Sequence, residues 1–248
     1  MIKLPPILLT SAVTISDSQP VLNQKSDRIE LTLYSIREWL ILEPGIKIVI
    51  CDGSDFDFSP LVSNMFPLAN IECLYFKNSS HLVSQFGKGF GEGEIIKFAL
   101  ANSRYLSESD FFAKCTSKLW VRNFRSCLNE WNGSFICDGD FSNVTKFKPF
   151  AFNHIDTRFY FSTKAFYVEN FLDAYQNVND KQGKSLEQCF KDVAISKQFQ
   201  HFIFPIRPEI AGVSGSTGKW EYVNFMARVK DRLKRVLMKY RSNLISVK

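Results

Sequence analysis

The residues from 46 to 59, IKIVICDGSDFDFS, constrain the fold more than any other stretch of the chain. The apolar, β-branched run over residues 46–50 predicts a buried strand of a parallel sheet. The apolar run stops at Asp52-Gly53-Ser54, residue types that favour a turn and do not extend a strand. In open α/β sheets, ligands bind at the carboxyl ends of the strands, so Asp52 is a candidate ligand contact. The alternative is that Asp52 only caps the helix that follows.

Strands and helices alternate on both sides of this segment. Strands are predicted over residues 7–14, 46–50, 71–76, 111–116, 135–138, 159–161 and 202–206, and helices over 27–43, 60–65, 94–106, 121–131, 164–176, 185–197 and 222–240. Asp27 and Glu30 have capping-box spacing at the start of the first helix. We therefore expect an α/β fold in a single domain, with a mostly parallel central sheet flanked by helices.

The positive charge of the chain is concentrated near its C-terminus. The formal net charge is +6, and residues 219–248 carry nine Lys or Arg against two acids, a balance of +7. Residues 1–218 carry the other 22 basic and 23 acidic residues, a balance of −1. The apolar residues over 222–240 form one stripe surrounded by Lys and Arg, which predicts a basic amphipathic helix for an anionic membrane surface. The alternative is a helix packed on the domain. Nucleic-acid binding is not expected, because the body is slightly acidic and carries no recognition motif.

The cysteines and the N-terminus favour a cytoplasmic protein. The six cysteines form no C-x-x-C pair, so neither a zinc site nor a disulfide framework is predicted. The N-terminal apolar stretch is short and is broken by Pro5 and Pro6, so we expect no secretory signal. No apolar run reaches the length of about 18 residues that would predict a transmembrane helix.

A second ligand-binding candidate is the segment HLVSQFGKGFGEG at residues 81–93, which we expect to be a loop before a helix. N–H groups at a helix N-terminus bind phosphates, and Lys88 would add a positive charge. The segment matches neither a Walker loop nor a dinucleotide fingerprint. Glu92 and Glu94 would repel an anion there, which leaves a plain loop as the alternative.

The ordered set of elements resembles the nucleotide-sugar half of a glycosyltransferase of the GT-A fold. The resemblance rests on the strand that ends in IVICDGS, residues 48–54, and covers roughly residues 5–220. More narrowly, KGFGEGEIIKFAL at 88–100 and FFAKCTSKLWVRNF at 111–124 look like bacterial capsule and O-antigen transferases. The resemblance implies a transferase domain over 1–218, and the charge pattern described above adds a basic amphipathic C-terminal helix over 219–248.

This resemblance also implies a donor site. Asp52 would hold the nucleoside. The glycine-rich loop over residues 212–219, which ends in Lys219, would close over the phosphates of the donor. The alternative is that this loop is only a flexible connection. The expected nucleotide-sugar contacts are Thr10, Arg28, Asp52, Gly53, Lys88, Gly91, Lys114, Thr116, Lys118 and Lys219.

The expected metal motif is missing. Other family members place a metal-binding Asp-x-Asp where this chain has Lys114-Cys115-Thr116-Ser117-Lys118. We therefore expect Lys114 and Lys118 to offset the diphosphate charge in place of Mn²⁺ or Mg²⁺, so no cofactor is assigned. The alternatives are solvated surface lysines, or a rival metal site at Asp138 and Asp140.

Sugar transfer with inversion needs a base for the acceptor hydroxyl. The resemblance places a carboxylate near the start of a helix in the acceptor half, where this chain has Glu187. Asp156, in the segment HIDTR, is the competitor. Each also has an ordinary explanation, as a helix N-terminal acid for Glu187 and as a loop ion pair for Asp156.

The expected activity is that of a hexosyltransferase-like glycosyltransferase at the inner face of the cytoplasmic membrane. It would move a sugar from a nucleotide-sugar donor, expected to be UDP-linked, to a lipid-linked or growing bacterial surface polysaccharide such as capsule or lipopolysaccharide O-antigen. The first alternative is a non-catalytic nucleotide- or glycan-binding protein at the membrane surface. The second is a nucleotidyltransferase, but residues 14–18, TISDS, lack the glycines that such enzymes usually carry after their first strand.

Overall fold

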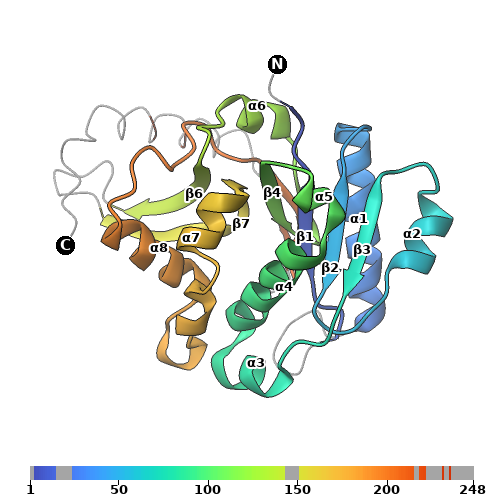
Figure 1. The fold of residues 1–248 in the computed structure, drawn as a ribbon, viewed down its shortest axis with the longest axis horizontal. Coiled ribbons are helices and arrows are strands. Elements are labelled where there is room, and N and C mark those ends of the chain that lie inside the picture. The colour runs from blue at the N-terminus through green and yellow to red at the C-terminus, as the bar shows by residue number, and fades with distance from the viewer. Residues whose placement is uncertain are drawn as a thin grey trace.

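A six-stranded mixed sheet forms the centre of the protein (Figure 1). The computed structural model describes residues 3–14, 24–142, 151–214, 218–221, 231 and 235. The strands are β1 (Ile7–Ser11), β2 (Ile48–Asp52), β3 (Ile71–Tyr75), β4 (Phe111–Thr116), β6 (Phe135–Ser142) and β7 (Ala151–Thr163). Their order is β3-β2-β1-β4-β7-β6; the first four run parallel, and β7 is antiparallel to both β4 and β6. The predicted α/β class with a mostly parallel sheet is confirmed.

Helices cover both faces of this sheet. One face packs on α1 (Lys25–Leu42), α2 (Ser59–Met65) and α6 (Phe124–Asn129). The other face packs on α4 (Lys88–Asn102), α5 (Arg104–Ser107), α7 (Lys164–Asn170) and α8 (Leu186–Ser196), with α4 and α8 in front of the sheet in Figure 1. In β2, Ile48 and Ile50 join the first core and Val49 joins the second, so an unbroken apolar run is required there.

A small antiparallel sheet lies beside α1. It pairs β5 (Leu119–Val121) with β8 (Ile210–Val213), and β8 with β9 (Trp220–Glu221). Ser35 and Trp39 of α1 hold it in place, because their side chains donate hydrogen bonds to the Leu119 carbonyl at 2.8 and 3.1 Å. No helix within the described ranges combines the length and the hydrophobicity needed to cross a bilayer.

Several element predictions are wrong. The first helix begins at Lys25, and its N-cap residue Gln24 makes no side-chain capping bond, so the capping box at Asp27 is not formed. Residues 202–206 form no strand; Ile203 makes only a single bridge to Cys137. Conversely, β5 and β8 are strands that the sequence did not predict. They form because the backbone groups of these two short segments, about 90 residues apart in the chain, hydrogen-bond to each other. The predicted helix over 222–240 lies outside the described residues except for Asp231 and Arg235, both of which are helical.

The glycine-rich segment over 81–93 is also not a loop. It contains α3 (Ser80–Phe86), a break at Gly87 with φ of 110°, and the first turns of α4. Gly89 lies against Leu186, and a Cβ on Gly93 would overlap with Tyr175. The glycines let α8 and the 3₁₀ helices η1 (Ala174–Asn177) and η2 (Asp180–Gln182) approach α4 closely.

Replacing Gly93 with alanine should therefore destabilise the fold, although alanine is the better helix former. The added methyl group would overlap with the Tyr175 side chain, and overpacking of this kind costs about 1–3 kcal/mol. Urea unfolding followed by circular dichroism measures the loss. Gly45→Ala is the matched control, because nothing lies within 4 Å of a Cβ at that position. Equal unfolding free energies for the two variants would contradict this account of the glycines.

Candidate functional site

Polar and charged side chains gather where β1, β2 and β4 end. The register pairs Ser11 with Asp52 and Thr10 with Thr116, so these strand ends share one edge of the sheet. Arg28 of α1 and Lys118, just after β4, are buried at the same edge. Carboxyl ends of parallel strands are where open α/β sheets bind ligands. The structure thus brings together five of the predicted donor-site residues: Thr10, Arg28, Asp52, Thr116 and Lys118.

Asp52 organises the backbone at this edge. Its Oδ1 accepts hydrogen bonds from the Ser54 amide (2.8 Å), the Ser54 hydroxyl (2.6 Å) and the Phe56 amide (3.3 Å). Its Oδ2 accepts one from the amide of Val13, in the segment after β1, at 3.1 Å. Asp52 is fully buried, and only Oδ2 has capacity for another donor. The predicted contact with a nucleoside therefore narrows to this one oxygen and stays a prediction.

Lys118 is a buried lysine, only 4% exposed, and within the part of the chain that the structure describes no oxygen accepts a hydrogen bond from its ammonium. Burial, and then the charge of Arg28, lower its pKa to about 7, against the opposing influence of Asp52 and Glu92. The pKa of Arg28 is also lowered by burial, with Asp52 opposing. An anion at this edge would relieve both penalties. The alternative of a solvated surface lysine is wrong for Lys118.

Lys114 is already paired inside the protein. Its side chain is fully buried in β4, where its ammonium forms an ion pair with Glu92 of α4 and donates to the Thr157 carbonyl at 2.8 Å. A longer contact of 3.4 Å reaches the Thr116 hydroxyl. Lys114 is thus not a solvated surface lysine either. Because Glu92 balances it, the cation available to a diphosphate is Lys118 rather than the pair that the sequence suggested.

An irregularity in β7 leaves the Thr157 carbonyl free of strand pairing, so it can accept the hydrogen bond from Lys114. The pairing of β6 with β7 jumps from Cys137–Tyr160 to Asp138–Asp156, which leaves Thr157, Arg158 and Phe159 without partners on β6. Extra residues of this kind bend a strand, re-aim its side chains and are frequent next to active sites. Here the Thr157 hydroxyl donates to Oε1 of Glu187 at 3.2 Å. Glu92, Lys114, Thr157 and Glu187 therefore form one connected polar network.

The two candidate bases have different surroundings. Glu187 lies in the first turn of α8, partly exposed, with the Thr157 contact on one oxygen. Asp156 is held by Arg158, whose Nε and Nη2 lie 2.9 and 2.6 Å from its two oxygens. Burial alone would raise the pKa of Asp156, but the hydrogen bonds and charge of Arg158 outweigh burial and lower this pKa. A carboxylate with a lowered pKa is the weaker base.

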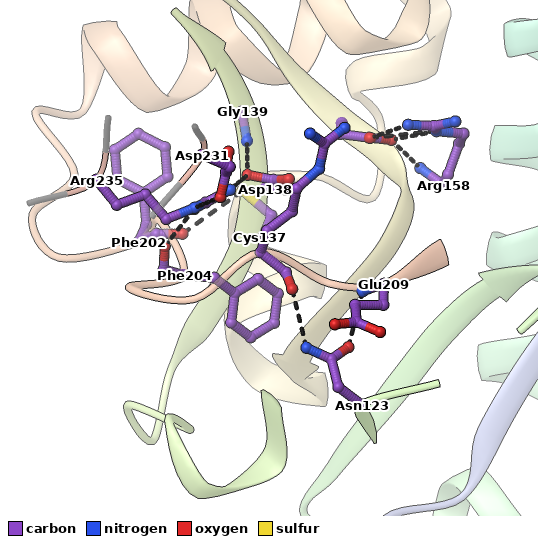
Figure 2. Close-up of polar contacts among 12 residues, drawn as sticks. Asn123, Cys137, Asp138, Gly139, Arg158, Phe202, Phe204, Glu209, Asp231 and Arg235 are labelled. Carbon is purple, nitrogen blue, oxygen red and sulfur yellow. Dashed lines mark hydrogen bonds and ion pairs between the residues drawn. The ribbon is translucent and has the colours of Figure 1, made fainter. Parts of the chain in front are cut away.

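The rival metal pair is engaged elsewhere (Figure 2). Oδ1 of Asp138 accepts from Nη2 of Arg235 at 2.8 Å, and Asp140 accepts from the Asn153 amide at 2.6 Å. Nε of Arg235 donates to Asp231 at 2.6 Å, and its Nη1 donates to the Phe204 carbonyl at 2.6 Å. A guanidinium on Asp138 is incompatible with a divalent ion on the same oxygen. The described residues also contain no cluster of three or more His, Cys, Asp or Glu suited to a metal.

The remaining predicted contacts are Gly53, whose amide donates to the Ser11 carbonyl at this edge at 2.9 Å, and Lys88, Gly91 and Lys219, which no described interaction places there. Lys88 is exposed at the start of α4, and Lys219 is exposed just before β9. Gly53 and Gly91 both lie against the Asn78 side chain, whose Nδ2 donates to the Gly91 carbonyl at 3.3 Å. Packing around Asn78 accounts for both glycines. Donor contacts by these four residues stay predictions.

Glu92 and Thr157 were missed as members of the site. On sequence grounds Glu92 is only a charge near a helix start, and nothing singles out Thr157. A signal for Glu92 was present, because a lysine inside the apolar strand FFAKCT needs a buried partner. No local signal marks Thr157, because its place depends on the register of β6 against β7.

No protein-family model and no curated protein matches the chain. Among solved structures, it is similar to the bifunctional IspDF from Campylobacter jejuni, at 13% identity and a TM-score of 0.47, over 94% of this chain and 54% of that one. It is similar to the glycosyltransferase GlyE in Streptococcus pneumoniae TIGR4, at 9% identity and a TM-score of 0.48, over 82% and 45%. The inositol-1-phosphate CTP transferase from T. maritima matches at 11% identity and a TM-score of 0.47, over 97% and 98%. The chain spans about half the length of the first two structures.

Proposed function

We propose that this protein is a glycosyltransferase that binds the diphosphate of a nucleotide-sugar donor at Lys118 and Arg28. The observation that carries the proposal is Lys118, a residue only 4% exposed at the carboxyl edge of the sheet, whose ammonium makes no hydrogen bond or ion pair among the described residues. Burying a charge without a partner is costly, so an anionic ligand is its natural complement.

In the proposed reaction the acceptor hydroxyl oxygen forms a bond to the anomeric carbon of the sugar. The bond between that carbon and the diphosphate oxygen breaks, and the nucleoside diphosphate leaves with the electron pair. Lys118 and Arg28 would stabilise the negative charge that develops on the leaving group. Because the residues at this edge suit an anion and not a divalent cation, no step is assigned to a metal.

Glu187 is the preferred base for the acceptor hydroxyl. It is partly exposed and held by Thr157, whereas Asp156 is bound by Arg158 and has a lowered pKa. Its connection through Thr157 to Lys114 and Glu92 supports a position beside the donor edge. Asp156 stays the competitor, and inverting transfer is part of this proposal.

The finer assignment concerns the acceptor. We assign a UDP-linked donor and a lipid-linked or growing surface polysaccharide, as the sequence resemblance suggested. The support for membrane contact is the charge of residues 219–248, nine basic against two acidic. A cationic segment of this size favours anionic lipid.

A binding and turnover experiment tests this function. UDP-sugars, GDP-sugars, CTP and UTP are screened by thermal shift, since a ligand that binds only the folded state raises the melting temperature. The preferred nucleotide sugar is then used in a transfer assay with a membrane extract as acceptor. Binding without transfer or donor hydrolysis would favour the non-catalytic alternative. Turnover of a nucleoside triphosphate with a sugar phosphate would favour a nucleotidyltransferase.

Glu187→Gln should lower kcat by about 100-fold or more, because loss of a general base typically costs 10²–10⁴ in rate. Nucleotide binding should stay within about twofold, since Glu187 does not contact the diphosphate edge. The control is Glu169→Gln, which removes an exposed carboxylate on the neighbouring helix α7. If Glu187→Gln turns over normally and Asp156→Asn does not, the base is Asp156.

A further inference from the structure

A short stretch of β7 beside Glu187 pairs with neither neighbouring strand. The pairing of β7 with β4 ends at Phe159, and its pairing with β6 stops at Tyr160 and resumes only at Asp156. Thr157, in the gap, is nevertheless 2% exposed. Buried backbone groups without a partner are costly, so side chains have to satisfy this stretch.

Two charged side chains do so. The amide of Arg158 donates to Oδ1 of Asp156 at 3.0 Å, and the ammonium of Lys114 donates to the Thr157 carbonyl at 2.8 Å. Asp156 is held in turn by the Arg158 guanidinium, at 2.6 Å. These contacts fix the irregular stretch in one conformation, and they give Asp156 a structural role that does not require contact with a substrate.

Lys114 has little freedom of its own. Its side chain is fully buried, and it forms an ion pair with Glu92 of α4. Tyr160 lies opposite it in the register of β4 with β7, and its ring centroid is 6.0 Å from the ammonium. A carboxylate, a carbonyl and an aromatic face thus surround one cation, and hydrogen bonds are stronger in such a desolvated site than in water. The Lys114 ammonium is a rigid anchor for the Thr157 backbone.

The fixed backbone determines where the Thr157 hydroxyl points. This hydroxyl donates to Oε1 of Glu187, in the first turn of α8, at 3.2 Å. Among the described residues none donates to Oε2 of Glu187, so this second oxygen is the one available to a substrate hydroxyl. A general base has to lie within hydrogen-bond reach of the proton that it removes, and a small misplacement of a reacting group lowers the rate strongly.

We propose that Thr157 and Lys114 are positioning residues for Glu187. Lys114 fixes the Thr157 backbone, the Thr157 hydroxyl fixes one oxygen of Glu187, and the proton of the acceptor hydroxyl passes to the other oxygen. The inference rests on the proposed function, because it takes Glu187 as the base for the acceptor hydroxyl. It gives Lys114 a role different from the diphosphate contact that the sequence suggested.

Thr157→Val should lower kcat by about tenfold or more, the effect of losing one hydrogen bond to a charged group. The donor KM and the UDP dissociation constant should stay within about twofold, because Thr157 acts on the base and not on the donor. Thr157→Ser keeps the hydroxyl and should restore most of kcat. Initial rates with the preferred nucleotide sugar and calorimetry with UDP measure these quantities.

The matched control is Thr163→Val, the same substitution at the end of the same strand. The Thr163 hydroxyl caps α7 by accepting from the Phe166 amide at 3.1 Å. Its loss should lower the melting temperature and leave kcat unchanged. A lower kcat in Thr157→Val together with a normal kcat in Thr163→Val then separates positioning from a general loss of stability.

A double-mutant cycle tests the part assigned to Lys114. Lys114→Met should also lower kcat, and Lys114→Met/Thr157→Val should lose no more than the larger of the two single losses, since both act through one carboxylate. Circular dichroism shows whether Lys114→Met folds; if it does not, the Thr157 variants decide the proposal by themselves.

The outcomes are distinguishable from a failure of the proposed function. Normal turnover by Glu187→Gln would remove the base and this inference with it. A lost kcat in Glu187→Gln beside a normal kcat in Thr157→Val would overturn the inference alone. Weakened UDP binding by Thr157→Val would also overturn it, because Thr157 would then act at the donor edge. Losses that multiply in the double variant would remove Lys114 from the role.

Discussion

Lys118→Met is expected to raise the melting temperature of the protein while weakening the binding of a nucleoside diphosphate by on the order of 100-fold. A methionine keeps most of the apolar length of the side chain and removes a buried charge that has no acceptor among the described residues. The same change removes a charge-assisted hydrogen bond to the ligand, which is worth about 1.5–3 kcal/mol. Differential scanning fluorimetry and isothermal titration calorimetry with UDP measure the two effects on one sample.

The pH dependence of binding should follow the same residue. Burial and Arg28 lower the pKa of Lys118 to about 7, so the free protein loses this proton near neutrality. A bound diphosphate favours the protonated form, so binding takes up a proton and affinity falls by up to about tenfold per pH unit above 7. Folding stability has the opposite sign: the unfolded chain keeps its lysine protons to higher pH, so this residue's penalty shrinks as pH rises above about 7. Both trends should vanish in Lys118→Met.

Lys47→Met is the control for these measurements. Lys47 is a partly exposed lysine paired with Glu108 at the surface, and its loss should change stability by less than about 1 kcal/mol. If Lys118→Met binds UDP as tightly as the wild type, Lys118 does not contact the ligand and the proposed diphosphate site is wrong.

Arg235→Gln is expected to lower the free energy of unfolding by about 3–5 kcal/mol, because it leaves buried acids without their cation. Burial raises the pKa of Asp138, and the charge and hydrogen bond of Arg235 oppose that rise. Arg235 also holds Asp231 and the Phe204 carbonyl, so one side chain joins three segments of the chain (Figure 2). Urea unfolding at pH 7 gives the size of the loss.

The matched control is Arg104→Gln, which removes a largely exposed arginine 4.0 Å from Glu108 and should cost less than about 1 kcal/mol. The double variant Asp138→Asn/Arg235→Gln should recover part of the loss, since the unpaired carboxylate is then gone. Similar stabilities for Arg235→Gln and Arg104→Gln would show that the segment ending at residue 235 is not anchored to β6 through this side chain.

The central sheet could be predicted from the sequence because its parallel strands are buried on both faces. An apolar run such as residues 48–51 is stable only inside the sheet, and Asp52-Gly53-Ser54 predicts the turn after it. The short strands β5 and β8 gave no such signal, since each depends on a partner far along the chain. The glycines over 87–93 indicated a loop, but close contacts from Leu186 and Tyr175 stabilise a helix there.

The sequence predicted which edge of the sheet carries the candidate site, but not the contacts made there. The position of Lys118 after β4 follows from the strand order alone. The ion pair of Lys114 with Glu92 depends on how α4 packs on the sheet, which the sequence does not show. The Thr157–Glu187 contact depends on a register jump in β7 that no local pattern encodes. Long-range pairing therefore decides which of the charged residues remain available to a ligand.

The glycines of α4 have a consequence for how the protein moves. Gly89, Gly91 and Gly93 each make the helix less favourable by about 1 kcal/mol relative to alanine, so its first turns owe their order to the neighbours that pack on them. Glu92 lies among these glycines and is the counter-ion of Lys114. Local opening of those turns would release the carboxylate and leave the Lys114 ammonium without its counter-ion. If an anion binds at the proposed site, its binding and the ordering of this helix would then be thermodynamically linked, without any rearrangement of the sheet.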